Sequence, residues 1–256
     1  MVFAHRGGAA LGPENTLVAF ERGLAAGAHG LELDVHLSRD GLVVVHHDDT
    51  LERTTNGRGP VAARTAAELG ALDAAWWFAP AEGHPLRGQG VGVPTLREVL
   101  ERHPSTRVII EMKLDSEAMG LAVADEVRRA KAEDRVCLAG FGAQALAAAR
   151  RRLPEVASSA HQLEVRWALY RSWCRWPVRP SAYGGYQVPE VASGHRIVSP
   201  RFVRHAHRAG LRVQVWTVDE AEDMRRLLGW GIDALITNRP DVAVREIGSW
   251  IQKLVN

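Results

Sequence analysis

The sequence predicts a (β/α)8 TIM barrel, in which eight parallel strands alternate with helices. A chain of 256 residues has a common length for such a barrel folded as one domain. Short apolar strand patterns alternate with amphipathic helix patterns along the chain. Polar and charged residues recur where the predicted strands end, and that edge carries the active site in these barrels. We therefore expect one domain, residues 1–256.

The first predicted unit is a strand, a loop and a helix. A short apolar strand, Val2–Ala4, leads into the sequence HRGG at 5–8. The sequence PENT at 13–16 then precedes a helical pattern that starts at Leu17, so Asn15 or Thr16 is the expected N-cap. The paired glycines allow the backbone to approach a phosphate closely.

A hairpin arm follows the second strand. The alternation in Gly30–Leu37 places Glu32 and Asp34 on one face. A four-residue turn then leads to the antiparallel arm Val43–His46, which begins with three valines, because so short a connection joins antiparallel strands. The arm therefore brings His47 back to the two carboxylates. A surface hairpin whose acids are merely solvated is the alternative.

An inserted loop region, residues 51–93, follows the arm. It lacks a sustained period and is expected to form one short helix at Thr65–Leu69. Loops of this length are usually functional. The next strand, Arg107–Met112, carries Glu111 at its end, and Lys113 follows two residues later on the same face.

The rest of the chain continues the alternation. Further strands are expected at 136–139, 155–159, 186–188, 211–218 and 234–236, and helices at 96–102, 116–132, 143–153, 200–209, 219–228 and 242–254. Without the arm, eight strands alternate with helices. The segment 166–186 interleaves aromatic residues with arginines, including Arg175 and Arg179. It is expected to line a substrate mouth, to touch a membrane surface or to form an ordinary packed flap.

Composition limits the classes of partner and compartment. The net charge is +2, and the absence of a basic tract argues against a nucleic-acid partner. Cys137 and Cys174 lack the spacing of a zinc or redox motif, so reduced thiols are expected. The start of the chain leaves no room for a signal peptide, and no apolar run of membrane-spanning length occurs. We expect a cytoplasmic protein without a stable membrane anchor; the oligomeric state is not predicted.

Three carboxylates form a candidate metal site at the mouth of the predicted barrel. Glu32, Asp34 and Glu111 lie at strand ends and offer the hard oxygen ligands that Mg²⁺ and Ca²⁺ prefer. Trp216 and Asn238 fall at the ends of two later strands. Trp216 is a candidate substrate contact.

Two cations and two histidines complete the candidate site. Arg6 and Lys113 supply positive charge for an anion, and His5 and His47 form an acid/base pair. This combination suits phosphoryl transfer, because one imidazole can deprotonate the nucleophile while the other protonates the leaving alkoxide.

Eight short motifs, spread in order over nearly the whole chain, carry a family resemblance. They are HRG at 5–7, PENT at 13–16, ELDV at 32–35, HDDTLERTT at 47–55, PTLREVL at 94–100, IIEMK at 109–113, VWTV at 215–218 and TNRP at 237–240. With these motifs the sequence resembles the glycerophosphodiester phosphodiesterase family.

The resemblance implies a role for each candidate residue. The implied roles are binding of Ca²⁺ or Mg²⁺ for Glu32, Asp34 and Glu111, general base for His5, general acid for His47, and phosphate binding for Arg6 and Lys113. The implied substrate is a small-molecule glycerophosphodiester, which releases an alcohol and glycerol 3-phosphate by way of a cyclic phosphate. Asn238 departs from the family pattern, because many members have Asp there.

Two other functions fit parts of this pattern. A related barrel phospholipase, of lysophospholipase D or phospholipase C type, would share the histidines and the cation and would receive an acyl chain between 51–93 and 166–186. A non-catalytic binder of phosphate ligands would keep the barrel mouth alone. The presence of both histidines and all three carboxylates argues against the binder.

Overall fold

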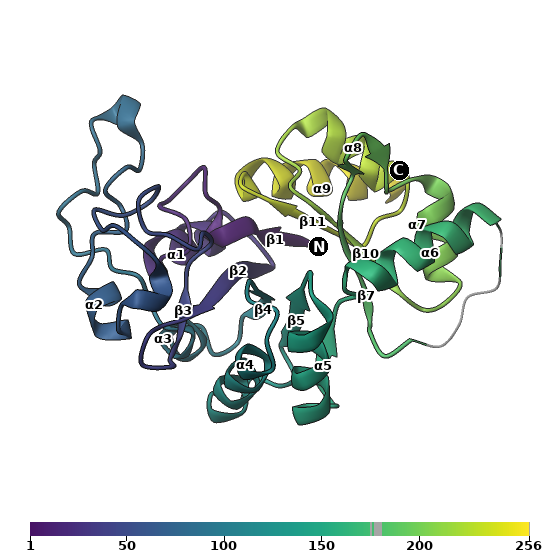
Figure 1. Cartoon of the computed structure of the whole chain (residues 1–256). Coiled ribbons are helices and arrows are strands. Elements are labelled where there is room, and N and C mark those ends of the chain that lie inside the picture. The colour runs from purple at the N-terminus through teal and green to yellow at the C-terminus, as the bar shows by residue number, and fades with distance from the viewer. Residues whose placement is uncertain (175, 177–180, 256) are drawn as a thin grey trace.

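The computed structural model describes residues 1–174, 176 and 181–255 (Figure 1). Its eight parallel strands are β1 (Val2–Ala4), β2 (Gly30–Leu37), β4 (Arg107–Met112), β5 (Val136–Gly140), β6 (Ala157–Ser158), β7 (Gly185–Pro189), β10 (Arg212–Trp216) and β11 (Ala234–Thr237). They are ordered β6-β5-β4-β2-β1-β11-β10-β7 in the sheet. The sheet nearly closes, because Ser159 after β6 forms a parallel bridge with Gly185. The predicted TIM barrel is confirmed.

Helices surround the barrel (Figure 1). They are α1 (Leu17–Ala25), α2 (Ala66–Gly70), α3 (Leu96–Arg102), α4 (Glu117–Arg129), α5 (Ala143–Arg152), α6 (Gln162–Cys174), α7 (Pro200–His207), α8 (Ala221–Gly229) and α9 (Pro240–Val255). Local sequence sets where several of them start. The Thr16 hydroxyl caps α1 by accepting from the Ala19 amide, and Thr65 and Thr95 form capping boxes at α2 and α3.

The core has an inner and an outer part. A small apolar cluster that includes Phe3, Ile109 and Ile236 packs together from the inward faces of three strands. The outer faces of the strands pack against the helices in two larger clusters. Because residues two apart on a strand share a face, Ile109 and Glu111 point the same way. The inner apolar cluster therefore lies below the carboxyl edge of the barrel.

The predicted hairpin arm is present. β3 (Val43–Val45) pairs antiparallel with β2 in a register that places Val35 opposite Val45. Residues 51–93 follow the arm with α2 and two short 3-10 turns, and they have a small apolar core of their own around Leu51 and Leu69. This segment extends to one side of the barrel, on the left in Figure 1.

One helix and a pair of short strands were not predicted. Residues 162–174 form α6, although apolar residues on both faces of that helix obscure the helical period. β8 (Val191–Ala192) and β9 (His195–Arg196) form a separate two-stranded sheet, too short to produce a pattern. Arg175 and Arg179 lie outside the described residues. Among the residues that are described, no helix combines the length and apolar character needed to cross a bilayer.

The contact between α4 and α5 yields a prediction about stability. A Cβ added at Gly120 would lie 2.2 Å from the Ala145 carbonyl oxygen, whereas one at Gly248, exposed on α9, would meet nothing within 4 Å. We expect Gly120→Ala to destabilise the protein by about 1–3 kcal/mol through overpacking. The control Gly248→Ala should stabilise it by roughly 0.5–1 kcal/mol through helix propensity. Urea denaturation would measure both, and equal effects would contradict the close contact.

Candidate active site

β2 and β4 bring three carboxylates together. These strands are parallel neighbours whose register pairs Asp34 with Glu111, and Glu32 shares the face of Asp34 because it lies two residues earlier. One oxygen of each of the three carboxylates lies within 4.8 Å of the other two. Glu32 and Asp34 are buried. This burial rules out the alternative of a solvated surface hairpin.

The crowding of the carboxylates has an electrostatic consequence. Burial, and next the nearby charges of Asp34 and Glu111, raise the pKa of Glu32 well above its ordinary value. Burial and Asp34 likewise raise the pKa of Glu111. Two cations offset part of this charge. Lys113 Nζ lies 2.8 Å from Glu111 and 3.3 Å from Asp34, and Arg6 Nε lies 3.3 Å from Asp34. The backbone amide of Arg6 also donates to Glu32 at 3.0 Å.

The turn after β1 positions two candidate residues. Arg6 adopts a left-handed conformation with φ 51°, which costs a non-glycine residue about 1–2 kcal/mol. Gly7 follows with φ 88°, and a Cβ there would lie 2.8 Å from the Ala19 backbone carbon. In the described part of the chain the buried Arg6 Nε makes no hydrogen bond, although Asp34 Oδ2 is 3.3 Å away. Arg6, which faces the carboxylates, therefore has both a strained backbone and a buried donor that lacks a hydrogen bond.

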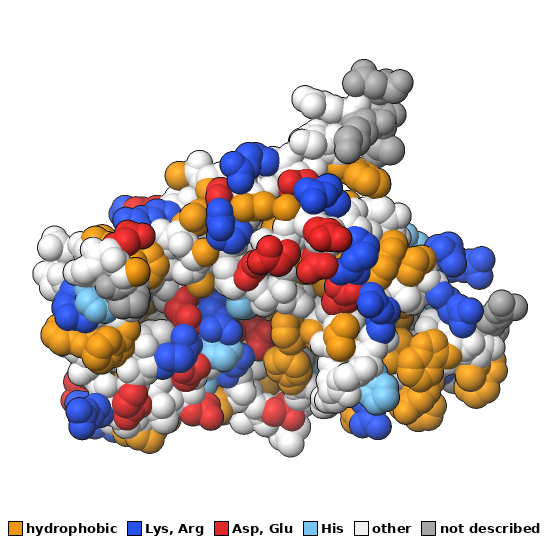
Figure 2. Space-filling model, turned by 90° about the horizontal axis from the view of Figure 1, so that it is seen from above, with side chains coloured by type: hydrophobic (Ala, Val, Ile, Leu, Met, Phe, Trp, Pro, Cys, Tyr) orange, Lys and Arg blue, Asp and Glu red, His pale blue; other side chains and the backbone are white. Residues whose placement is uncertain are grey.

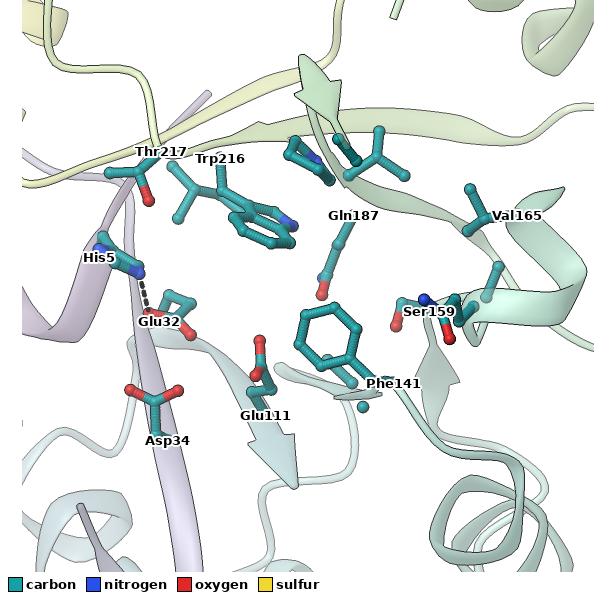
Figure 3. Close-up of a pocket in the computed structure, with 18 of the residues that line it drawn as sticks. His5, Glu32, Asp34, Glu111, Phe141, Ser159, Val165, Gln187, Trp216 and Thr217 are labelled. Atoms are coloured by element: carbon teal, nitrogen blue, oxygen red, sulfur yellow. Dashed lines mark ion pairs between the residues drawn. The ribbon is translucent and has the colours of Figure 1, made fainter. Parts of the chain in front are cut away.

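His5 is oriented by the opposite end of the chain. Its Nδ1 lies 2.8 Å from Asn238 Oδ1, while the Asn238 side-chain amide donates to Asp219 at 2.8 Å. Because an amide oxygen can only accept, His5 Nδ1 carries the proton and Nε2 is left as an acceptor. His5 Nε2 lies 3.9 Å from Glu32, as the dashed line in Figure 3 shows. Burial, and then Arg6, lower the pKa of His5.

His47 has a different partner. Its Nδ1 lies 2.6 Å from Asp48, whose carboxylate also accepts from Arg53 at 2.6 Å. The hydrogen bond from Arg53 holds the pKa of Asp48 well below its usual range. The neighbouring His46 packs inward, where its Nε2 lies 3.1 Å from the Thr50 carbonyl oxygen. Strand alternation thus leaves His47 as the histidine that faces the site.

The PENT sequence contributes more than a helix cap. Asn15 is buried, and its side-chain amide donates to Asp34 at 2.9 Å. Glu14 accepts from Arg6 at 2.9 Å and from Arg53 at 2.7 and 2.8 Å. These supporting roles, which join residues 8, 19 and 39 positions apart in the sequence, were not predicted. The motifs at 13–16 and 47–55 contain all of these residues except Arg6 and Asp34.

One cavity of about 360 Å³ joins the predicted residues. It is lined by all eight of them: His5, Arg6, Glu32, Asp34, His47, Glu111, Lys113 and Trp216. Figure 3 shows the carboxylates and His5 on one side and Trp216, Phe141 and Val165 on the other. The rings of Trp216 and Phe141 meet edge to face with centroids 5.9 Å apart. The cavity therefore has a charged side and a mainly apolar side, which Ser159, Gln187 and Arg166 also line.

The chain is similar to known proteins over nearly its whole length. The model of the glycerophosphoryl diester phosphodiesterase family matches residues 5–242. A glycerophosphodiester phosphodiesterase of Caldanaerobacter subterraneus is 31% identical over 249 residues, which cover 95% of this chain and 96% of that protein.

Two solved structures are also similar. The glycerophosphoryl diester phosphodiesterase domain of a Mycobacterium tuberculosis protein superposes with a TM-score of 0.82 and 25% identity, over 98% of both chains. A phosphodiesterase of Oleispira antarctica, in complex with its product sn-glycerol-3-phosphate, has a TM-score of 0.79 and 27% identity, over 97% of this chain and 96% of that one.

The fold and the comparisons show that the protein is an enzyme, a phosphoric diester hydrolase built on a TIM barrel. The predicted family is confirmed as well. The chain belongs to the glycerophosphoryl diester phosphodiesterase family.

The Glu14–Arg53–Asp48 cluster yields a prediction about pH. Burial would raise the pKa of Glu14, but its bonds to Arg53 and Arg6 prevail and lower it to about 2. A folded-state pKa below the unfolded value of about 4.3 stabilises the protein above that pH, and this stability is lost as the pH falls towards 2. We therefore expect Arg53→Gln to lower the free energy of unfolding at pH 6 and to have progressively less effect between pH 5 and pH 2.

Urea denaturation at several pH values would measure this difference. Arg58→Gln, on an exposed residue of the same segment, is the control and should show no such trend. A wild-type advantage that stays constant down to pH 2 would contradict the assigned ion pairs.

Proposed function

We propose that this enzyme hydrolyses glycerophosphodiesters to an alcohol and glycerol 3-phosphate in a metal-dependent reaction, with residues 1–256 acting as one domain. The observation that carries the proposal is the joint placement of the three clustered carboxylates, both histidines and both cations on one cavity. The complex of the Oleispira antarctica relative with sn-glycerol-3-phosphate supports the choice of substrate.

The carboxylates of Glu32, Asp34 and Glu111 fit a divalent cation. All three are hard oxygen donors, and burial together with the neighbouring charges of Asp34 and Glu111 raises the pKa of Glu32, so a cation bound here would stabilise the ionised carboxylates. Ca²⁺ and Mg²⁺ both suit such donors. The chemistry that a bound cation supplies here is neutralisation of nonbridging phosphate oxygens and polarisation of the phosphorus towards attack.

His5 is proposed as the general base. Asn238 fixes the proton on Nδ1, so Nε2 can accept the proton of the glycerol hydroxyl as its oxygen attacks the phosphorus. The lowered pKa of His5 keeps the imidazole neutral near pH 7, as a base requires. The departure from Asp to Asn at position 238 preserves this function, because the partner of His5 needs only to accept a hydrogen bond.

His47 is proposed as the general acid. An ionised carboxylate partner, Asp48, suits an imidazole that carries the proton before reaction, whereas the neutral amide of Asn238 suits one that must accept it. His47 would protonate the departing alcohol oxygen as its bond to phosphorus breaks. Water would then open the cyclic phosphate with the roles of the two histidines reversed, which yields glycerol 3-phosphate.

Arg6, Lys113 and Trp216 are proposed as substrate contacts. Arg6 Nε is a buried donor that makes no hydrogen bond among the described residues, so a phosphate oxygen would satisfy it. Lys113 lies on the same charged side, next to Asp34 and Glu111. Trp216 faces the cavity beside Phe141 and offers an apolar surface to substrate carbon atoms.

A lysophospholipid is the second candidate substrate. Apolar residues line the half of the cavity away from the carboxylates, among them Phe141, Val165 and Ile197. This surface could hold the acyl chain carried by the glycerol part of a lysophospholipid, as a lysophospholipase D would require, while the head-group alcohol leaves. Val165 belongs to α6, whereas Phe141 follows β5 and Ile197 follows β9, and residues 51–93 do not contribute to the lining. Higher turnover of micellar lysophospholipid than of glycerophosphocholine would favour this function.

The metal site yields a prediction about activity. Glu32→Gln, Asp34→Asn and Glu111→Gln should each lower kcat/KM about 100-fold or more, because each removes a hard ligand. Release of glycerol 3-phosphate from glycerophosphocholine, glycerophosphoethanolamine and glycerophosphoinositol would be measured with and without EDTA. Calorimetric titration with Ca²⁺ or Mg²⁺ should show weaker binding in each variant. Unchanged affinity in all three, or activity that survives EDTA, would refute the metal site.

The two histidines yield a prediction about leaving groups. Because a general acid matters most for a poor leaving group, His47→Ala should lower kcat/KM on glycerophosphocholine about 100-fold or more, and much less on a nitrophenyl ester analogue. His5→Ala should impair both substrates, because each needs its nucleophile activated. His46→Ala serves as the control for the adjacent histidine that packs inward. Equal losses of His47→Ala on both substrates would refute the assignment.

A further inference from the structure

An exposed aromatic stripe runs along α6. Trp167, Tyr170 and Trp173 follow at intervals of three residues and are 62%, 48% and 48% exposed. Neighbouring rings contact edge to face, with centroids 6.4 and 5.6 Å apart. Leu163, one turn earlier, is also exposed. Of the eleven large apolar side chains exposed in the described part of the chain, five come from residues 163–176.

The opposite face of α6 is already packed. Ala168, Leu169 and Ser172 are buried, and the first two belong to the core that α7 shares. A helix that is apolar on both faces is ordinarily buried on both. The outer face of α6 therefore presents the kind of apolar patch that marks an interaction surface.

Positive charge surrounds the stripe. Residues 161–212 contain nine arginines and two glutamates, whereas the rest of the chain contains 23 basic and 28 acidic residues. Arg166 is exposed beside the aromatic residues of α6. The adjoining helix α7 and its C-cap carry three more exposed arginines, Arg201, Arg204 and Arg208. In Figure 2, hydrophobic and basic side chains lie together at the right-hand end, where α6 and α7 lie in Figure 1.

These arginines differ from those elsewhere on the surface. Within the described residues, no carboxylate lies within 4 Å of the side-chain nitrogens of Arg166, Arg201, Arg204 or Arg208. On the surface of α5, by contrast, Arg151 pairs with Glu117 at 2.9 Å and Arg152 pairs with Asp125 at 2.9 Å. The charge beside α6 is therefore available to a partner of opposite charge.

We propose that this surface, which we call the α6–α7 face, docks on an anionic lipid bilayer. It consists of Leu163, Arg166, Trp167, Tyr170, Trp173, Arg201, Arg204 and Arg208. Tryptophan and tyrosine rings prefer the headgroup region of a bilayer, and arginines pair with its phosphates. A helix with this composition lies in the interface plane without crossing it.

Charge complementarity selects the bilayer over a second copy of the chain. A two-fold dimer through this face would place each patch against its own copy, so two patches of the same positive charge would face each other. Anionic lipid headgroups supply the opposite charge over the whole area. The docked surface would adjoin the active site, because Gln162, Val165 and Arg166 of α6 line the same cavity as the carboxylates.

Vesicle co-sedimentation of the full chain tests the proposal without any need for turnover. We expect binding to phosphatidylcholine vesicles that contain phosphatidylglycerol, little binding to phosphatidylcholine alone, and weakening by added salt. The double variant Arg204→Gln/Arg208→Gln should lower the partition coefficient about 25-fold, at about fivefold per arginine. Trp167→Ser/Trp173→Ser should lower it as well and abolish the blue shift of tryptophan fluorescence on vesicles.

Matched controls exclude a general loss of charge or of aromatic side chains. Trp77→Ser changes a tryptophan of similar exposure, 51%, and Arg58→Gln changes an exposed arginine, both in residues 51–93. Both should bind like the wild type, and circular dichroism should show that every variant melts as the wild type does. Absence of wild-type binding at low salt would overturn the proposal, as would binding that both double variants retain.

Two further outcomes would assign the face to another partner and also overturn the proposal. One is self-association in sedimentation velocity that the tryptophan variant abolishes, without vesicle binding. The other is binding of single-stranded DNA without vesicle binding.

Discussion

Repulsion among three carboxylates at the carboxyl edge of the barrel is the constraint on which the site depends. At separations near 4.8 Å, two such charges repel by about 3 kcal/mol at an effective dielectric constant of about 20. The three carboxylates cannot move apart to lower this repulsion, because the register of β2 and β4 fixes them side by side. Relief comes from positive partners, Lys113 and the Arg6 turn, together with the side-chain amide of Asn15.

These partners come from separate segments, so the site depends on the whole barrel. Arg6 has a strained, left-handed backbone conformation and lies beside Asp34. Arg53, in the segment after the arm, forms an ion pair with Glu14. His5 takes its orientation from Asn238, which is 233 residues away in sequence. That contact follows from topology, since β1 and β11 are parallel neighbours whose carboxyl ends meet. The pairing of β1 with β11 therefore gives His5 an amide partner, whereas His47 pairs with Asp48, the next residue in the chain.

The sequence allowed much of this to be predicted, because strand alternation and the rule that sites lie at carboxyl ends are local. Glu32 and Asp34 share a face in any strand, and the short turn forces the antiparallel arm that carries His47. The supporting contacts of Asn15 and Arg53 could not be predicted in the same way, since they depend on how the loop after β1 packs against β2 and against the segment after β3, which no local pattern records. Only the presence of these residues within longer motifs indicated that they had a role.

The failure to predict α6 has a different cause. Periodicity identifies a helix by contrast between an apolar face and a polar face, and α6 buries Leu169 while it exposes Trp167 and Tyr170. The net charge of +2 likewise conceals an uneven distribution of charge. Residues 161–212 are rich in arginine, and the rest of the chain is acidic, so the two contributions nearly cancel. Amphipathic periodicity and an even balance of charge are expected for a segment whose outer face is in water. The segment around α6 has both an apolar outer face and an excess of arginines, and it lies beside the cavity. Contact with lipid in place of water would account for both features, and this is the physical basis for expecting a lipid interface there.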